Sequence, residues 1–311
     1  MSATPRPKGR GAGAPGASDV SDASAGTLVL VATPIGNLGD LSPRARDTLA
    51  SADVVCCEDT RRTRALLTHA GVRGKTLLSL HGHNEVARLA EVIGRLAQGA
   101  TVAVVSDAGT PAVSDPGARL VAAAVAAGAT VSTVPGPSAV IAALVVSGLP
   151  TTRFVFEGFL PRRGSERRQR LDGLAAERST VVLFESPARL AATLSDLLTR
   201  CGPERPVVVA REITKLHEEV WRGTMAEAAE VFLHREVQGE VVVVLGGAPV
   251  AVVSHDDGEV EAALRLRLEA GDSRRDAAAA VAGLLGVTRR RAYEAAALLQ
   301  PPPECRDRPG G

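Results

Sequence analysis

The chain has 311 residues, of which 45% are hydrophobic and 23% charged, so it can bury a sizeable core and is long enough for two ordinary domains. A formal net charge of +1 excludes a uniformly basic nucleic-acid-binding surface, and one Trp, one Tyr and five Phe are too few for rows of stacking aromatic side chains. The four cysteines lack zinc-site or disulfide-framework spacing, and no apolar run reaches the length of a membrane span. We therefore expect reduced thiols in a cytoplasmic protein that has neither a membrane helix nor a signal peptide.

The first part of the chain predicts a tail followed by an α/β domain. Residues 1–26 are rich in Pro, Gly, Ala and Ser without hydrophobic periodicity, so we expect a disordered tail. From Thr27, short apolar runs alternate with helical patterns, which is typical of a largely parallel, helix-covered sheet, and the first domain is predicted over 27–150. Its expected strands are 28–32, 53–57, 101–105 and 130–134, and its expected helices lie near 43–51, 60–70, 84–98, 116–127 and 137–147.

After Pro150 the pattern restarts and predicts a second α/β domain over 151–248, followed by a linker near 249–255. A small all-α module is predicted over 256–300, because Arg274 to Leu285 and Thr288 to Leu298 have helix-turn-helix spacing around Gly286. Residues 301–311 are expected to fray. The second domain's expected strands lie near 154–157, 180–184, 206–210 and 240–245, and its expected helices near 165–177, 188–200 and 224–235.

Four loops of the first domain are rich in the residues that line ligand sites. In an open α/β sheet, ligands lie beyond the carboxyl ends of the strands, where Gly, Pro and small polar residues let the backbone approach them. Each loop alone could be an ordinary turn, but four on one edge favour a binding cleft. No phosphate-binding loop is present, because the stretch 69–76 lacks the first glycine and precedes a strand. The four loops are 32–41, 57–63, 105–117 and 134–139.

These loops carry the motifs of a known family. The matching phrases include Val31-Ala-Thr-Pro-Ile-Gly-Asn-Leu38, Glu58-Asp-Thr-Arg61, Ser106-Asp-Ala-Gly-Thr-Pro111, Pro135-Gly-Pro-Ser-Ala139 and Ala210-Arg-Glu-Ile-Thr-Lys215. Over about 27–247 the chain resembles the tetrapyrrole (corrin/porphyrin) methylase superfamily, and particularly its branch that modifies ribosomal RNA.

The resemblance implies a two-domain α/β fold with a C-terminal helix-turn-helix module, a homodimer, and S-adenosylmethionine bound in the cleft between the domains. It also implies a reaction, the 2'-O-methylation of a cytidine ribose in the decoding centre of 16S ribosomal RNA. The position with Ser138 carries Cys in some relatives, which leaves its role intact. Carried over to this chain, the cofactor residues are Pro34, Asp107, Ala108, Gly109, Thr110, Val113, Ser114, Pro137, Ser138, Ala139, Phe184 and Ala210.

A ribose hydroxyl ionises far above neutral pH, so methyl transfer to it needs a base, or cations that stabilise the forming alkoxide. Among the acidic candidates, Glu58, Asp59 and Glu185 could have a structural role as helix caps in place of a catalytic one. His81, His83 and Glu85 have no further ligand at zinc spacing, so hydrogen bonding is favoured there and no metal is predicted. The residues that we expect to carry the substrate chemistry are Asp59, His83, Arg211, Glu212 and Lys215.

RNA binding requires a local basic surface. The segment 161–170 has five arginines and one glutamate, and clustered guanidinium groups suit phosphate contacts better than a merely solvated helix start. The segment 273–298 adds five arginines against two acids, and could also be a plain helical appendage. The predicted RNA-binding residues are Arg162, Arg163, Arg167, Arg168 and Arg170.

Two other functions stay open at this stage. A methylase of a corrin or porphyrin intermediate would share the fold and cofactor, and the arginine cluster would also suit a polycarboxylate substrate. A ligand-sensing DNA-binding regulator would use the helix-turn-helix, although its second helix is mostly Ala and Leu apart from Arg289 to Arg291 and Tyr293.

Overall fold

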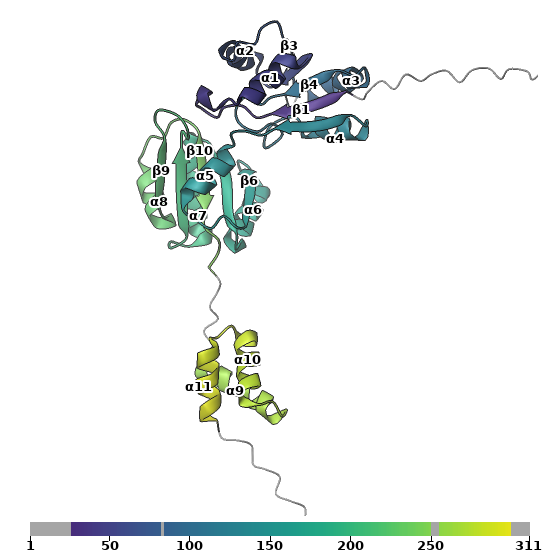
Figure 1. The fold of residues 1–311 in the computed structure, drawn as a ribbon. Helices are drawn as coiled ribbons and strands as arrows, with labels where there is room; N and C mark the ends of the chain where they lie inside the picture. The colour runs from purple at the N-terminus through teal and green to yellow at the C-terminus, as the bar shows by residue number, and fades with distance from the viewer. Residues whose placement is uncertain (1–25, 82–83, 250–254, 300–311) are drawn as a thin grey trace, which may run out of the picture. The chain divides into compact units, whose positions relative to one another are not determined.

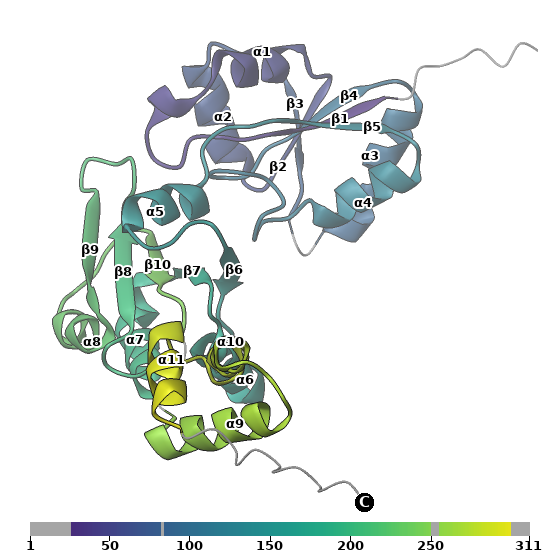
Figure 2. The same ribbon diagram turned by 60° about the horizontal axis from the view of Figure 1, so that its bottom comes forward.

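A computed structural model describes residues 26–81, 84–249 and 255–299. The chain divides after Ala248 into two compact units, which are described separately (Figures 1 and 2). Several predictions lie outside the described residues. These are the two tails, apart from Gly26, most of the linker, and the site residue His83.

The first unit begins with a five-stranded parallel sheet. Its strands are β1 (Thr27–Val31), β2 (Val54–Cys57), β3 (Thr76–Ser79), β4 (Thr101–Val104) and β5 (Thr130–Val134), in the order β3-β2-β4-β1-β5. Every pairing in this sheet is parallel, so all strands end at the same edge. We call this sheet and its helices the first lobe.

The helices of the first lobe bury both faces of its sheet. One core packs α1 (Pro43–Ser51) and α2 (Thr60–His69) on residues such as Val31, Val55 and Ala103, and the other packs α3 (Glu85–Ala97) and α4 (Ala118–Ala126) on residues such as Leu28, Val54 and Val102. Burial on both faces explains why β1, β2 and β4, at the centre of the sheet, are nearly continuous apolar runs.

The second sheet is mixed. Its strands are β6 (Phe154–Phe159), β7 (Thr180–Glu185), β8 (Pro206–Arg211), β9 (Glu219–Thr224) and β10 (Val241–Leu245), in the order β6-β7-β10-β8-β9. Only β6 and β7 pair in parallel, whereas β10 runs antiparallel to both of its neighbours. The last strand in sequence therefore lies in the middle of the sheet.

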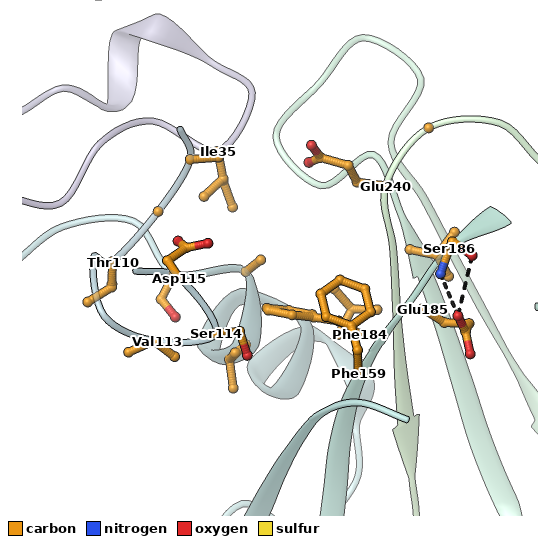
Figure 3. A pocket seen from close by; sticks show the side chains of 18 of the residues that line it. Ile35, Thr110, Val113, Ser114, Asp115, Phe159, Phe184, Glu185, Ser186 and Glu240 are labelled. Atoms are coloured by element: carbon orange, nitrogen blue, oxygen red, sulfur yellow. Dashed lines mark hydrogen bonds between the residues drawn. The ribbon is translucent and has the colours of Figure 1, made fainter. Parts of the chain in front are cut away.

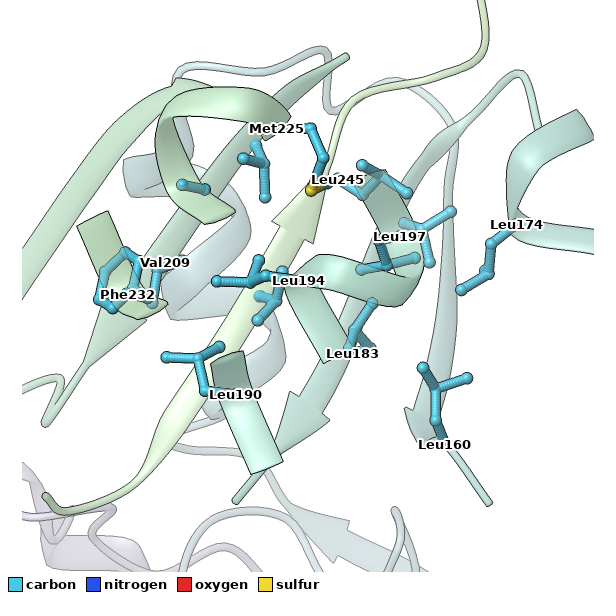
Figure 4. Close-up of a cluster of buried hydrophobic side chains, with 14 of the residues drawn as sticks. Leu160, Leu174, Leu183, Leu190, Leu194, Leu197, Val209, Met225, Phe232 and Leu245 are labelled. Atoms are coloured by element: carbon cyan, nitrogen blue, oxygen red, sulfur yellow. The ribbon is translucent and has the colours of Figure 1, made fainter. Parts of the chain in front are cut away.

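Four helices cover the second sheet, and with it they form the second lobe. On one face α6 (Gly164–Ala176), α7 (Pro187–Cys201) and α8 (Met225–Leu233) bury a core that includes Leu190, Leu194 and Phe232 (Figure 4). The other face is covered by α5 (Ala139–Ser147), whose Val140, Ala143 and Leu144 are buried against residues of β7, β8 and β10. Helix α5 follows β5 directly, so it connects the last strand of the first sheet to the face of the second.

The second unit is a bundle of three short helices, α9 (Asp257–Glu269), α10 (Arg274–Leu285) and α11 (Arg289–Leu298). Asp256, Ser273 and Thr288 cap the three helices through their side chains, and Gly286 ends α10 in the left-handed conformation. Its own core contains Val260, Leu264 and Val281, so the unit buries apolar surface by itself.

The architecture confirms the predicted α/β fold with a helical C-terminal module. The structure adds β3 and β9, which are not among the expected strands. Within the described ranges, no helix combines the length and the apolar character needed to cross a bilayer.

Candidate functional site

The loop after β4 connects the other three loops at the carboxyl edge of the first sheet. The backbones of Thr33 and Gly109 exchange two hydrogen bonds of 2.9 and 3.1 Å. Asp107 Oδ1 accepts from the amide of Asp59 at 3.0 Å, and the hydroxyl of Thr110 donates to the carbonyl of Pro137 at 3.2 Å. The four loops that the sequence places at one edge therefore form a single hydrogen-bonded surface.

A cavity of about 360 Å³ lies between this surface and the second sheet, within the size range of small-molecule sites. The first lobe contributes Ile35 and the loop residues 108–110 and 113–115, while the second contributes Phe159, Phe184 and the segment 239–242. Figure 3 shows Asp115 on one wall, with Phe184 and Glu240 coming from the other lobe. The cavity is therefore built by residues far apart in sequence.

Backbone strain is concentrated beside this cavity. Among the described residues other than glycine, a positive φ occurs at Ala112, Ser114, Glu212 and Thr214, with values between 52° and 69°. Such conformations are unfavourable for side chains with a Cβ, and they persist where the surrounding structure imposes them, often at functional sites. Ser114 lines the cavity, and the carboxylate of Glu212 lies against Gly239, which also lines it.

Most of the predicted cofactor residues face this cavity. Asp107 and Pro34 instead line a neighbouring pocket of about 260 Å³, together with Arg62. Pro137 contributes the carbonyl that accepts from Thr110, and Ala210 is fully buried in the core under α5. The eight predicted residues that line the cavity are Ala108, Gly109, Thr110, Val113, Ser114, Ser138, Ala139 and Phe184.

The cavity wall requires small residues. Gly109 has a φ of +81°, and a Cβ there would lie 3.2 Å from Cγ2 of Ile35 and 3.7 Å from the carbonyl of Pro137. Ala108 and Ala139, which also line the cavity, have only a methyl side chain. This wall suits a ligand that is held largely by backbone N–H and C=O groups.

Glu212 and Lys215 form a charged cluster at the rim of the cavity. Lys215 Nζ donates to Glu212 Oε1 at 2.7 Å and to Glu240 Oε2 at 3.2 Å, and Glu240 lines the cavity. The stem of Lys215 passes over Gly36, where an added Cβ would lie 2.3 Å from its Cγ. Glycine at this position therefore allows the β1 loop to contact the cluster in the second lobe.

The protonation of this cluster follows from its hydrogen bonds. The bond from Lys215, followed by that from the Glu240 amide, lowers the pKa of Glu212. Burial lowers the pKa of Lys215, but the hydrogen bonds to Glu212 and Glu240 outweigh it and leave this pKa raised. The lowered pKa makes the Glu212 carboxylate a weak base, and Lys215 stays protonated, so neither is suited to accept the proton of a hydroxyl group.

Two other predicted catalytic residues have structural partners. Asp59 caps α2 by accepting from the amide of Arg61 at 2.7 Å, and this bond lowers its pKa. Arg211 donates to Glu219 Oε2 at 3.2 Å and to the carbonyl of Gln238 at 3.3 Å. The structure therefore brings Glu212 and Lys215 together. Asp59 instead makes the helix-capping contact that the sequence left open as an alternative to a catalytic role.

Asp115 is a cavity residue that the motif reading did not single out. No ion pair engages its carboxylate in the described part of the chain, whereas Glu185 pairs with Arg189 and Glu240 with Lys215. Burial, followed by the charge of Glu58, raises the pKa of Asp115 to about 6, although a hydrogen bond from Ser106 lowers it. A carboxylate with this pKa is mostly ionised near neutral pH and can accept a proton.

Other lining residues were also missed, and they come mainly from the second sheet. Ile35 lies within the quoted phrase 31–38 and Asp115 within the predicted loop 105–117, so a broader selection from those segments would have included them. No sequence signal indicates that the β10 segment lines the cavity, because its position beside the cavity depends on the order of the strands in the sheet. The lining residues absent from the predicted set are Ile35, Asp115, Val140, Phe159, Glu185, Ser186, Pro187, Gly239, Glu240, Val241 and Val242.

The five predicted RNA-binding arginines differ in their surroundings. Arg167 is mostly buried and bonds to Asp196, Thr193 and the carbonyl of Pro161, so it ties α6 to α7. Arg170 pairs with Glu157 at 2.8 Å. The other three, Arg162, Arg163 and Arg168, are exposed, and within the described residues no carboxylate pairs with them.

No cluster of three His, Cys, Asp or Glu side chains that could hold a metal ion occurs in the described ranges.

Comparisons with known proteins agree on one family. The sequence profile of the tetrapyrrole (corrin/porphyrin) methylases matches residues 27–229. A relative from Synechocystis sp., "Ribosomal RNA small subunit methyltransferase I", is 46% identical over 270 residues, which cover 86% of this chain and 96% of the relative. A relative of the same name from Thermotoga maritima is 48% identical over 222 residues, which cover 71% of this chain and 99% of the relative.

A solved structure supports the fold. The chain is similar to uroporphyrin-III C-methyl transferase from Thermus thermophilus complexed with S-adenyl homocysteine, with a TM-score of 0.50 and 22% identity over 71% of this chain and 97% of that one.

Proposed function

Because the chain belongs to the tetrapyrrole (corrin/porphyrin) methylase family, and within it to the ribosomal RNA small subunit methyltransferases I, we propose that it methylates a ribose 2'-hydroxyl of a cytidine in 16S ribosomal RNA. The observation that carries this proposal is the cavity between the lobes, whose walls are the loops with the family's motifs. The target is expected in the decoding centre.

The cofactor is S-adenosylmethionine, and the cavity fits it. Its size, its small-residue wall at 108–110 and the ring of Phe184 suit a ligand with an adenine, a ribose and a methionine portion. When bound, this group supplies an electrophilic methyl group on a sulfonium. The loop residues 108–114 and 138–139 would hold it, and the strained backbone at Ser114 fixes the geometry of that wall.

Asp115 would accept the proton of the 2'-hydroxyl at its carboxylate. It lines the cavity, no cation pairs with it in the described residues, and its raised pKa matches the task better than the lowered values of Asp59 and Glu212. Within the described residues, Lys215 donates to Glu212 and Glu240, which leaves its third N–H free to donate a hydrogen bond to the substrate at the rim of the cavity. Asp59 would keep α2 and the β4 loop in place through Asp107.

The partner is ribosomal RNA, either free or within the small subunit, in the cytoplasm. A homodimer is also proposed, because α5 presents an exposed apolar face with Ile141 and Val145, which are 47% and 64% exposed. A second copy of the chain would cover this face.

The direct test compares ribosomal RNA nucleosides from cells with and without the gene by mass spectrometry. Loss of one 2'-O-methylcytidine, restored by the wild-type gene but not by an Asp115→Asn variant, is the expected result. An unchanged nucleoside profile would contradict the RNA function.

The alternatives are less well supported. The relatives at 46% and 48% identity carry the ribosomal RNA name, whereas the similarity to the porphyrin enzyme is 22% and concerns the fold alone. In the helical unit, Arg291 of α11 bonds to Asp257 and to the carbonyl of His255, which occupies part of the basic group that a DNA-reading helix would need.

A further inference from the structure

Phe159 is an exposed aromatic side chain at the mouth of the cofactor cavity. The residue is 55% exposed, in a chain that has only five phenylalanines. It lines both the cavity and a neighbouring hollow of about 590 Å³, whose other lining residues are Leu160, Pro161, Arg162, Ser186 and Arg189. The ring therefore forms a wall shared by the cofactor cavity and a second open site.

The backbone of β6 directs this ring. The pairing of β6 with β7 is irregular between Phe156 and Gly158, and Gly158 has a φ of +70°. A Cβ at Gly158 would lie 3.2 Å from the hydroxyl oxygen of Ser114, so glycine allows the strand to approach the cofactor loop closely. Bulges of this kind redirect side chains next to active sites.

The ring is also supported from below. Its centroid lies 5.4 Å from that of Phe184, with the two planes inclined at 55°, and Phe156 packs on Phe184 from another side at 5.1 Å. The rings of Phe159 and Phe184 lie together in Figure 3. A supported ring that keeps more than half of its surface exposed can receive another planar group.

The hollow beside the ring is positively charged. Arg189 is held by Glu185 at 2.6 Å and by the carbonyl of Leu160 at 3.2 Å. Arg162 lines the same hollow, and its guanidinium group has no carboxylate partner among the described residues. The site thus combines an aromatic surface with an uncompensated cation, which suits a nucleotide.

We propose that this hollow receives the target nucleotide, with its base stacked on Phe159 and an adjacent phosphate bound by Arg162. The proposal rests on the proposed function. A ribose can reach the cofactor cavity only if its nucleotide is splayed out of any base stack, and a splayed base needs a new stacking surface. Phe159 provides such a surface at the boundary of the cavity, so it would hold the base while the ribose faces Asp115.

The test uses Phe159→Leu, which keeps apolar bulk, and Phe159→Tyr, which keeps the ring. The substrate is small ribosomal subunits from cells that lack the gene. Loss of stacking on one base is expected to raise KM for the subunits by about 5- to 100-fold in the leucine variant and little in the tyrosine variant. Phe159 also lines the cofactor cavity, but the residues proposed to hold the cofactor are the loops 108–114 and 138–139. The Kd of S-adenosylmethionine, measured by calorimetry, should therefore change by a much smaller factor than KM for the subunits.

Phe154→Leu is the matched control, because Phe154 is an exposed ring (38%) at the other end of the same strand and lines neither hollow. Its KM should equal that of the wild type. Arg162→Gln should reduce the slope of log K for subunit binding against log salt concentration by about 1, which corresponds to one lost phosphate contact.

Three results would overturn the stacking proposal. If Phe159→Leu weakens cofactor binding and leaves KM for the subunits unchanged, the ring holds the adenine of the cofactor. If Phe159→Leu and Phe154→Leu both behave as the wild type, the ring stacks on nothing. If Phe159→Tyr raises KM for the subunits as much as Phe159→Leu does, the site depends on side-chain shape and not on stacking. The proposed function fails separately, when the wild-type protein methylates no subunit RNA.

Discussion

As the proposed proton acceptor, Asp115 predicts a specific pH dependence of the reaction. Its folded-state pKa is raised from 3.8 to about 6, and the proton acceptor must be ionised. We expect kcat/KM for methylation to fall as the pH drops below about 6 and to lose that limb in Asp115→Asn, whose rate should be at least about 100-fold lower. A variant that retains both the rate and the limb would assign the proton to another group.

The same shift predicts a change in stability. A carboxyl group with a raised folded-state pKa contributes stability that is complete below its unfolded pKa of 3.8 and is lost as the pH rises through about 6. The Asn variant has no such loss. Its Tm relative to the wild type should therefore increase from pH 4 to pH 8, which thermal melts can measure, and an equal difference at both pH values would contradict the shift.

Gly109 allows the cofactor wall to be tested against a matched control. Gly109 and Gly148 have similar φ values of +81° and +78°, but a Cβ at Gly148 would meet nothing within 4 Å. Valine at either position should destabilise the fold by about 1–3 kcal/mol. Only Gly109→Val should also weaken S-adenosylmethionine binding in calorimetry, by about tenfold or more, since each 1.4 kcal/mol of lost contact is a factor of ten. Equal weakening in both variants would mean that strain, and not the cavity wall, is responsible.

At this scale the sequence indicates which small loop residues line the cavity, because their identity reflects a local requirement for close backbone approach. It does not distinguish between the surroundings of the carboxylates. Asp59 and Asp115 both follow strands of the first sheet, and only the arrangement in space shows that the first caps a helix while the second faces the cavity.

Among the elements, the apolar strands and the amphipathic helices were predicted close to their observed bounds. The exceptions are β3 and β9, which are absent from the expected strands. Strand β3 has only four residues, none of them fully buried, and the residues of β9 are all half-buried or exposed and include Glu219 and Arg222, so it has no apolar run. The order of the strands in each sheet could not be predicted from the sequence either. The position of β10 between β7 and β8 brings the segment 239–242 to the cavity, and it depends on pairings between distant residues.

Helix α6 and the turn before it contain three exposed arginines, proposed to bind RNA, and one structural arginine. Replacing Arg162, Arg163 and Arg168 by Gln should weaken RNA binding and reduce the log–log salt slope by about 2–3, since each phosphate contact contributes about 0.7–0.9. Cofactor affinity and Tm should not change. The measurement is binding to small-subunit RNA over a salt series.

Arg167→Gln serves as the contrasting variant. Because Arg167 bonds to Asp196, Thr193 and Pro161, its loss should destabilise the second lobe by about 1–3 kcal/mol and leave the salt slope unchanged. If the triple variant keeps the wild-type slope, the three exposed arginines are only a solvated surface.

In the whole molecule, the helical unit is expected to be separable from the chemistry. It has its own core, and the Thermotoga maritima relative is covered to 99% by 222 aligned residues, so that chain has no length for such a unit. Deleting 249–311 should leave cofactor affinity and the main thermal transition unchanged while weakening subunit binding. Loss of cofactor binding in the truncated protein would show that the unit supports the catalytic fold.

The position of α5 has a consequence for synthesis on the ribosome. Every residue from Ala139 to Val146 is apolar, and the helix is made before any strand of the sheet that buries it. Its central partner, β10, ends at Leu245, roughly a hundred residues later, which at ordinary translation rates of about 5–20 residues per second is a delay of about 5–20 s. During that interval the nascent chain carries an unpaired apolar helix. We expect this segment to be the main site at which chaperones engage the emerging protein, and pauses in translation between 148 and 245 to favour its aggregation.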